Sequence, residues 1–256
     1  MLLHRNMGGS IAAFALLWVA AGSVAQTPPE GDELARSIVE KADHIRLPQD
    51  PYQVDVSITT TAPDKDPEIR KYRILSKGNE NTIVLTLEPL IDRGQILLMR
   101  GHDLWIFMPN LSQPIRLSVA QRLTGQVANG DLARANFSGD YVPTITGTRD
   151  CGDEICHLLQ LAAVDRSVTY HRVVYWVAQK TGRPIRAEFY SLSDQLLKTA
   201  VYRNVKKLGG QARPTEILIT NALRAEEESL LEYSNLKLRD LPDKMFTKEY
   251  LKKLDY

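Results

Sequence analysis

The sequence predicts a mainly β protein of the α+β class, in which one leading helix precedes a long series of antiparallel strands. Three observations support this prediction. Near the start of the mature chain, apolar residues recur at three- and four-residue spacings. From Tyr52 onward they recur mostly at every second residue, and turns rich in Gly and Asn separate the apolar runs. The hydrophobic fraction of 43% and charged fraction of 25% are typical of a globular chain with a substantial core.

The first 25 residues predict a removable export signal. Arg5 lies in a polar start, residues 11–21 are apolar, and residues 23–25 form a small-x-small cleavage site. We expect residues 26–31 to be a linker and residues 32–256 to form one domain, soluble in the periplasm after cleavage. An uncut membrane anchor is the alternative, although the apolar run is shorter than a membrane span of about 20 residues.

The charge balance argues against an anionic partner. The chain has 32 Lys+Arg and 31 Asp+Glu, and loss of the leader removes Arg5 alone, which leaves 31 minus 31, or zero. No nucleic acid partner is therefore expected. The sequence has no nucleophile elbow, zinc-protease motif, phosphate loop or dinucleotide fingerprint, and its five histidines are scattered. We therefore predict neither an enzyme nor a bound metal or cofactor.

The elements follow in order from these patterns. A helix is expected from Asp32, which can cap it, to just before Pro48. Its apolar side consists of Leu34, Ala35, Ile38, Ala42 and Ile45. Ten or eleven strands are expected, the first from Tyr52 and the others at Ile69–Ser76, Asn81–Leu87, Gln95–Met99, Leu104–Met108, Tyr141–Thr148, His157–Ala163, Thr169–Gln179, Pro184–Ser191, Leu196–Val205 and Glu216–Ala222. A closing segment is expected at Ser229–Lys237. Helical spacing returns at Ser118–Phe137, where two short helices are expected, and around Phe246–Leu254.

The hairpin at residues 95–108 is apolar on both faces. If Gly101-His102 is its two-residue turn, Leu98 pairs with Trp105 and Ile96 pairs with Phe107 on one side of the sheet. Such strands are covered on both sides, or are covered on one side and face an apolar ligand on the other. Plain burial is the more common of these explanations.

The two cysteines, Cys151 and Cys156, lie at the ends of a predicted hairpin loop. In an oxidising compartment they can face each other at bridging distance, so a disulfide is expected. Metal binding with the adjacent His157 is the competing hypothesis, but a four-coordinate zinc site needs more ligands than this spacing offers. The spacing also differs from that of thioredoxin-like redox pairs.

The chain resembles the outer-membrane lipoprotein-sorting family related to the periplasmic lipoprotein carrier LolA. The resemblance lies in residues 103–109, an aromatic strand ending in proline, in residues 123–133 of the central segment, and in residues 176–190, where a tryptophan strand turns into a strand led by proline. It extends over nearly the whole mature chain and implies a strongly curved, incomplete antiparallel β-barrel whose concave face is covered by helices. Residues 151–156 and 230–256 depart from the smaller carrier.

The resemblance implies an apolar cavity for acyl chains. Two functions follow from it: a carrier or acceptor of a lipidated protein or free lipid, with an inner-membrane transporter as a further partner, or a lipid-sensing regulatory or assembly module that binds a partner protein. We expect a monomer. The strand positions whose large apolar side chains would line the concave side are Val54, Val56, Ile83, Leu85, Ile96, Leu98, Trp105, Phe107, Val174, Trp176 and Phe189. For any single one of them, ordinary core packing is the more common role.

Overall fold

The computed structural model describes residues 1, 33–134 and 136–251. The predicted export signal from residue 2 onward, the linker at residues 26–31 and the end of the predicted terminal helix lie outside the described residues. The mainly β prediction is confirmed, because 13 strands form one antiparallel sheet and few helices accompany it. None of the helices that the structure describes has the length and apolar content needed to span a bilayer.

The strands of the sheet are β1 (Tyr52–Thr61), β2 (Glu68–Lys77), β3 (Asn81–Glu88), β4 (Ile96–Arg100), β5 (Asp103–Phe107), β6 (Ile115–Leu117), β9 (Tyr141–Asp150), β10 (Ile155–Ala163), β11 (Arg172–Ala178), β12 (Pro184–Tyr190), β13 (Leu196–Leu208), β14 (Gln211–Asn221) and β15 (Glu228–Leu238). A separate hairpin consists of β7 (Arg122–Thr124) and β8 (Val127–Ala128). The helices are α1 (Glu33–Arg46), α2 (Asn129–Ala133), α3 (Phe137–Asp140) and α4 (Lys248–Leu251), with single 3₁₀ turns η1 (Leu90–Asp92) and η2 (Asp243–Phe246).

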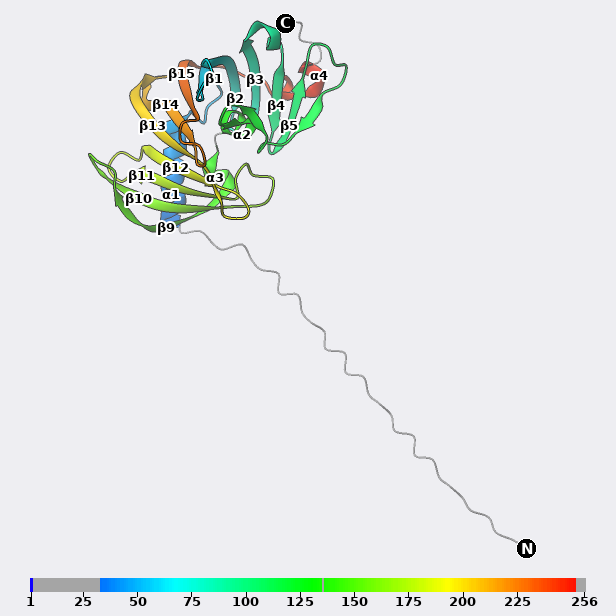
Figure 1. Cartoon of the computed structure of the whole chain (residues 1–256). Helices are drawn as coiled ribbons and strands as arrows, with labels where there is room; N and C mark the ends of the chain where they lie inside the picture. The colour runs from blue at the N-terminus through cyan, green and yellow to red at the C-terminus, as the bar shows by residue number, and fades with distance from the viewer. Residues whose placement is uncertain (2–32, 135, 252–256) are drawn as a thin grey trace.

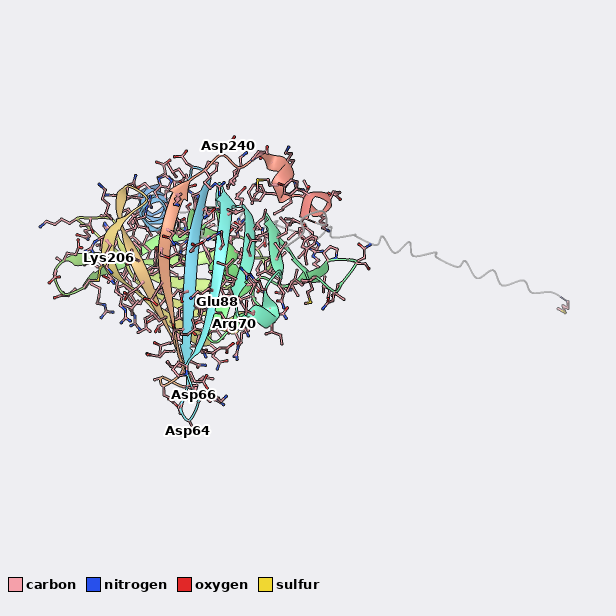
Figure 2. The ribbon with its side chains drawn as sticks, turned by 90° about the horizontal axis from the view of Figure 1, so that it is seen from above. Asp64, Asp66, Arg70, Glu88, Lys206 and Asp240 are labelled. Atoms are coloured by element: carbon pink, nitrogen blue, oxygen red, sulfur yellow. A yellow bond between two sulfur atoms is a disulfide. The ribbon has the colours of Figure 1, made fainter. Side chains whose placement is uncertain are left out.

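The chain builds the sheet in two halves that meet at its middle. Strands β1 to β6 follow one another to one edge, and the chain then starts again at the other edge with β9 and returns strand by strand to β15, which pairs with β1. Figure 1 shows β9–β12 running at a steep angle to β1–β5. Figure 2 shows the loop that joins β1 and β2, with Asp64 and Asp66 at its tip, at the opposite end of the sheet from Asp240.

Helix α1 packs on one face of the sheet, against β9, β11, β12 and β14 (Figure 1). The predicted helix is confirmed, and its buried side consists of Ala35, Val39, Ala42 and Asp43. Leu34 was expected on this side but is 57% exposed, because the buried stripe follows Ala35, Val39 and Ala42 and leaves Leu34 beside it. Arg213 of β14 donates to the carbonyl oxygens of His44 and Ile45 at distances of 2.5 and 3.0 Å, which satisfies two acceptors at the helix end.

The prediction of two short helices in residues 118–137 is only partly correct. Helix α2 lies within this range, but α3 begins only at its last residue, Phe137, and the residues before α2 form the β7–β8 hairpin. Gly125 takes a φ of 49° in its turn, and the amide of Gln126 donates to Ser229 Oγ at 3.0 Å. The four-residue spacing of Val119, Leu123 and Val127 arises here from a hairpin packed against the sheet, since tertiary contacts override so short a helical pattern.

Candidate ligand cavity

Two apolar clusters lie on the two faces of the sheet. The larger contains residues of α1, α2 and α3 together with alternate residues of nearly every strand; we call this side the helix-covered face. The smaller packs β3, β4 and β5 against Leu241, Phe246 and Leu251 near the C-terminus; we call this side the opposite face. Lys248 Nζ lies 3.8 Å from the ring centroid of Trp105, and this contact holds α4 against the opposite face.

The eleven residues predicted to line one cavity do not share one face. Val54, Val56 and Phe189 belong to the cluster on the helix-covered face. Six others belong to the opposite face, where the C-terminal segment covers them: Ile83, Leu85, Ile96, Leu98, Trp105 and Phe107. Val174 and Trp176 are half-buried and alternate with the fully buried Val173, Tyr175 and Val177 of the helix-covered face, so they point to the other side.

This correction has a simple physical reason. The predicted pairs Leu98 with Trp105 and Ile96 with Phe107 are confirmed, as is the Gly101-His102 turn. Both faces of this hairpin are apolar, however, so alternation alone cannot say which face the helices cover. The C-terminal segment supplies a second apolar layer, and the residues that face the helices are Leu97, Met99 and Leu104.

A cavity of about 40 Å³ lies on the helix-covered face between the sheet and the three helices α1, α2 and α3. Aromatic rings form much of its wall: Phe137 of α3 makes edge contacts with Tyr141, Tyr175 and Phe189 at centroid distances of 5.6, 5.3 and 6.3 Å. The residues that line it are Arg46, Gly130, Asp131, Arg134, Phe137, Asp140, Tyr141, Thr169, Tyr170, Phe189, Ala200, Tyr202, Ile217, Ile219 and Leu231.

Three buried ion pairs surround this cavity. Arg134 donates through Nε to both carboxylate oxygens of Asp140, at 2.8 and 2.6 Å. Lys198 Nζ pairs with Asp131 and also donates to the carbonyl oxygen of Gln126 at 2.8 Å. The third pair, Arg46 with Asp43, is looser, with Nη2 at 3.3 Å from Oδ1. Each pair keeps its charges buried by neutralising them locally.

Burial shifts the pKa values of several of these groups. It raises the pKa of the Asp43 carboxyl, although Arg46 and the Ser138 amide oppose the shift. It lowers the pKa of the Lys198 ammonium, opposed by Asp131. It also raises the pKa of the Tyr170 hydroxyl well above its ordinary value, and this hydroxyl donates to Asp131 Oδ1 at 2.7 Å.

The same pairs hold α2 and α3, which we call the cover, against the rest of the molecule. Asp131 caps the start of α2 by accepting from the Ala128 amide at 2.7 Å. Asp43 of α1 accepts from the Ser138 amide at the start of α3 at 2.8 Å. At the other end of α3, Asp140 lies 2.9 Å from His102 Nε2, and Arg134 donates to the Gly101 carbonyl oxygen at 2.9 Å. The cover is therefore tied to α1, to β13 and to the turn between β4 and β5.

Two larger grooves lie on the surface of the molecule, and one of them shares a wall residue with the cavity. A groove of about 240 Å³ lies between β2–β6 and the β7–β8 hairpin, and its apolar walls include Leu97, Ile106 and Leu123. A second groove of about 310 Å³ is lined by Tyr170 and Lys198, and Tyr170 also lines the small cavity. The Tyr170 ring thus lies between the small cavity and this groove.

Comparisons with known proteins give the family. A protein-family model described as "Uncharacterized protein" matches residues 78–253. The crystal structure of a LolA superfamily protein from Nitrosomonas europaea is 57% identical, with a TM-score of 0.81, and the match covers 84% of this chain and 98% of that one. The chain belongs to the LolA superfamily. The search of curated proteins found no match.

Two more distant structures share the LolA-superfamily fold of this chain. A protein from Vibrio parahaemolyticus, described as an outer membrane lipoprotein-sorting protein domain, is 18% identical with a TM-score of 0.72, and the match covers 86% of this chain and 99% of that one. A DUF1329 family protein from Desulfovibrio piger is 21% identical with a TM-score of 0.71, and the match covers 88% and 100%. At these identities the likeness concerns the fold alone.

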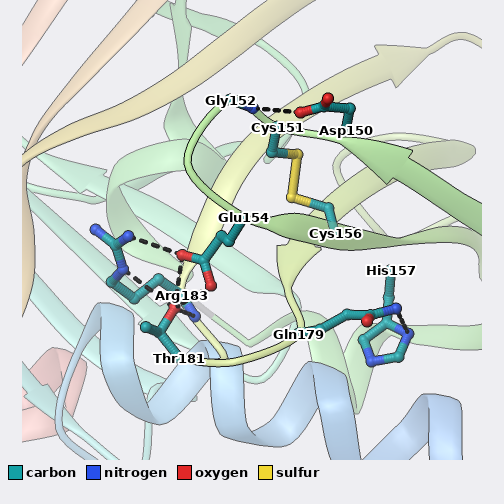
Figure 3. Close-up of a disulfide and its surroundings, with 9 residues drawn as sticks. All are labelled: Asp150, Cys151, Gly152, Glu154, Cys156, His157, Gln179, Thr181 and Arg183. Atoms are coloured by element: carbon teal, nitrogen blue, oxygen red, sulfur yellow. Dashed lines mark hydrogen bonds and ion pairs between the residues drawn. A yellow bond between two sulfur atoms is a disulfide. The ribbon is translucent and has the colours of Figure 1, made fainter.

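The predicted disulfide between Cys151 and Cys156 is present in this LolA superfamily member, at the tip of the β9–β10 hairpin (Figure 3). Beside it, Glu154 accepts from Arg183 Nη2 at 2.9 Å and from the Thr181 hydroxyl at 3.2 Å, which joins this tip to the β11–β12 turn. Among residues 33–134 and 136–251, no cluster of three His, Cys, Asp or Glu side chains could hold a metal ion. The disulfide joins Cys151 and Cys156 across the turn between β9 and β10.

Sequence reasoning missed the buried ion pairs of the cavity. Lys198 and Asp131 are 67 residues apart, and Asp43 and Ser138 are 95 residues apart, so no local spacing connects them. One signal was available: Asp43 and Arg46 lie three residues apart on the leading helix, one of them within its apolar stripe. A carboxylate on the buried side of a helix indicates a partner in the core.

Proposed function

We propose that this protein is a periplasmic carrier or acceptor that binds a lipidated protein or a free lipid in the cavity on its helix-covered face, for outer-membrane lipoprotein or lipid trafficking. In this proposal the sheet acts as an incomplete barrel that curves around the acyl chain, and α1 and the cover close it. The observation that carries the proposal is the cavity itself, enclosed between the sheet and short helices in a LolA superfamily fold. The protein would reach the periplasm as a monomer after cleavage near residue 25, and an inner-membrane transporter would supply its cargo.

The small cavity corresponds to the closed state of such a carrier. Ligand pockets usually measure about 300–1,000 Å³, whereas this one holds about 40 Å³. An acyl chain therefore requires movement of the cover, which would join the cavity to the groove of about 310 Å³ on the other side of Tyr170. Each buried methylene contributes about 0.8 kcal/mol, so a long chain can provide the free energy that opening costs.

Of the residues first expected to contact the ligand, we retain Val54, Val56 and Phe189, which lie on the helix-covered face. We add Phe137 of the cover, since its ring stands between Phe189 and Tyr175 and has to move when the cavity opens. The six residues beneath the C-terminal segment are excluded from this proposal, because Leu241, Phe246 and Leu251 already bury them.

Native mass spectrometry of the mature protein, purified after periplasmic expression, tests the proposal. We expect a fraction of the protein to carry a bound amphiphile that denaturing extraction releases and identifies. Ala200→Leu adds carbon atoms to the cavity wall and should lower the bound fraction, because Ala200 is 1% exposed and lines the cavity.

Val201→Leu is the matched control, since Val201 is the next residue along β13 and points to the other side of the sheet. It should leave the bound fraction unchanged while circular dichroism confirms that both variants are folded. A protein that never carries an amphiphile and also rejects an added fluorescent fatty acid is not a lipid carrier.

A further inference from the structure

Arg46 is a buried cation with unused hydrogen-bonding capacity. It is the last residue of α1 and its side chain is 10% exposed. The guanidinium lies 4.4 Å from the centroid of the Phe137 ring and donates to Asp43 at 3.3 Å. Its buried Nε has no hydrogen-bond partner within the part of the chain that the structure describes. A guanidinium carries five N–H donors, and Arg46 also interacts with the Tyr202 hydroxyl, so the Nε donor is the one that remains for another acceptor.

A second unpartnered group lies close by. The hydroxyl of Tyr175 is buried and, in the described chain, lacks a hydrogen-bond partner. Tyr175 contacts the same Phe137 ring at 5.3 Å and interacts electrostatically with Arg46. Buried polar atoms without partners are uncommon in native proteins and often mark a place for a missing polar group. Here two of them flank one aromatic ring at the cavity wall.

The charges around the cavity decide what kind of acceptor fits. The cations Arg46, Arg134 and Lys198 are each paired with one carboxylate, from Asp43, Asp140 and Asp131 respectively. An added carboxylate or phosphate would leave this buried set with a net negative charge, which is costly to bury. A neutral oxygen acceptor adds no charge. The volume of about 40 Å³ also suits a carbonyl group and not a chain.

We propose that Arg46 is the hydrogen-bond donor for a neutral carbonyl oxygen of the ligand, the ester or amide that joins the acyl chain to the rest of the molecule. This inference rests on the proposed function and adds a chemical preference to it. The carbonyl takes up the free N–H of Arg46, and the acyl chain extends toward the space that the cover leaves when it opens.

A matched pair of lipids tests this preference. Monopalmitoylglycerol carries an ester carbonyl, and its hexadecyl ether analogue has the same chain length and head group without the carbonyl. Affinities for both are measured by displacement of a fluorescent fatty acid. We expect the wild-type protein to bind the ester about tenfold more tightly, the effect of one hydrogen bond to a charged donor. Arg46→Met should remove this difference, and Arg46→Lys should keep part of it.

Arg36→Met is the control, since Arg36 is an exposed arginine of the same helix, and it should keep the full ester preference. If Arg46→Met does not fold, the comparison in the wild-type protein and in Arg46→Lys still decides the question. Equal affinity of the wild-type protein for ester and ether would overturn the role of Arg46 while leaving the lipid carrier intact. Failure of the wild-type protein to bind either lipid would overturn the proposed function itself.

Discussion

Replacement of Asp140 by leucine should release α3 and strongly destabilise the protein. Asp140 and Arg134 have side chains that are 6% and 4% exposed, so water screens their interaction very little. Two hydrogen bonds of 2.8 and 2.6 Å join Arg134 Nε to the carboxylate, and His102 contributes a third contact at 2.9 Å. Asp140→Leu removes these contacts, together with the ion pair between Arg134 Nη2 and Asp140 Oδ1, and leaves Arg134 as a buried cation without a counter-ion.

The expected magnitude follows from this burial. Removal of one partner of a buried ion pair costs about 3–5 kcal/mol, much of it the penalty of the remaining charge. Since the total free energy of unfolding of a native protein is about 5–15 kcal/mol, the change is easily measured by urea denaturation. The exposed pair of Arg116 and Asp103, with side chains 72% and 48% exposed, is the control, and Asp103→Ala should cost no more than about 1 kcal/mol.

A double-mutant cycle separates the ion pair from other effects. Arg134→Met combined with Asp140→Leu replaces both charges by apolar side chains, and such replacements of buried pairs are often neutral or stabilising. We expect the double variant to be at least about 2 kcal/mol more stable than Asp140→Leu alone. The reasoning is refuted if Asp140→Leu costs less than about 1 kcal/mol and its effect simply adds to that of Arg134→Met.

Three further predictions follow from single sites. Gly125→Ala should destabilise the protein by about 1–3 kcal/mol more than Gly78→Ala, measured by urea denaturation. Both glycines have positive φ, but only at Gly125 would a Cβ overlap side chains of β1 and β15. Equal losses of stability in the two variants would contradict this packing. Burial raises the pKa of Asp43, so above about pH 4 the folded state keeps a proton that the unfolded state loses, and the free energy of unfolding of the wild type should fall as the pH rises. In Asp43→Asn this fall should be less steep. Parallel curves of the two proteins, from denaturation at a series of pH values, would refute this prediction. Removal of the disulfide by Cys151→Ser with Cys156→Ala should cost about 2 kcal/mol, given the five-residue separation, and unchanged stability in the same assay would show that the crosslink does not constrain the unfolded chain.

Most strands of the sheet could be predicted from local sequence patterns. Alternation and turn residues predicted the strands on both sides of Gly101-His102, and the register of this hairpin is fixed by its short turn. Strand β6 was missed because its three residues are too few for a period-two pattern and their pairing with β5 depends on tertiary contact. The β7–β8 hairpin was mistaken for helix for a related reason, since its few residues depend on Thr60 and Ser229 for support.

The presence of a cavity could be predicted, but the residues that line it could not. The family resemblance implied an apolar space beneath helices, and Phe189 is among the residues that line the cavity in the structure. However, where both faces of a sheet are apolar, distant segments decide which face the helices cover. Here the segment from Leu241 to Leu251 packs against the face that was first assigned to the ligand. The polar lining was not visible in the sequence because Lys198 and Asp131 meet only in the folded chain.

The most direct test of the central claim is to locate a bound lipid. The mature protein is incubated with a palmitic acid that carries a photoreactive diazirine on its chain, irradiated and digested, and the labelled peptides are identified by mass spectrometry. The account predicts labels on the helix-covered face, in peptides that contain Phe137 and Phe189. Labels confined to the opposite face, around Trp105 and Phe107, would contradict it.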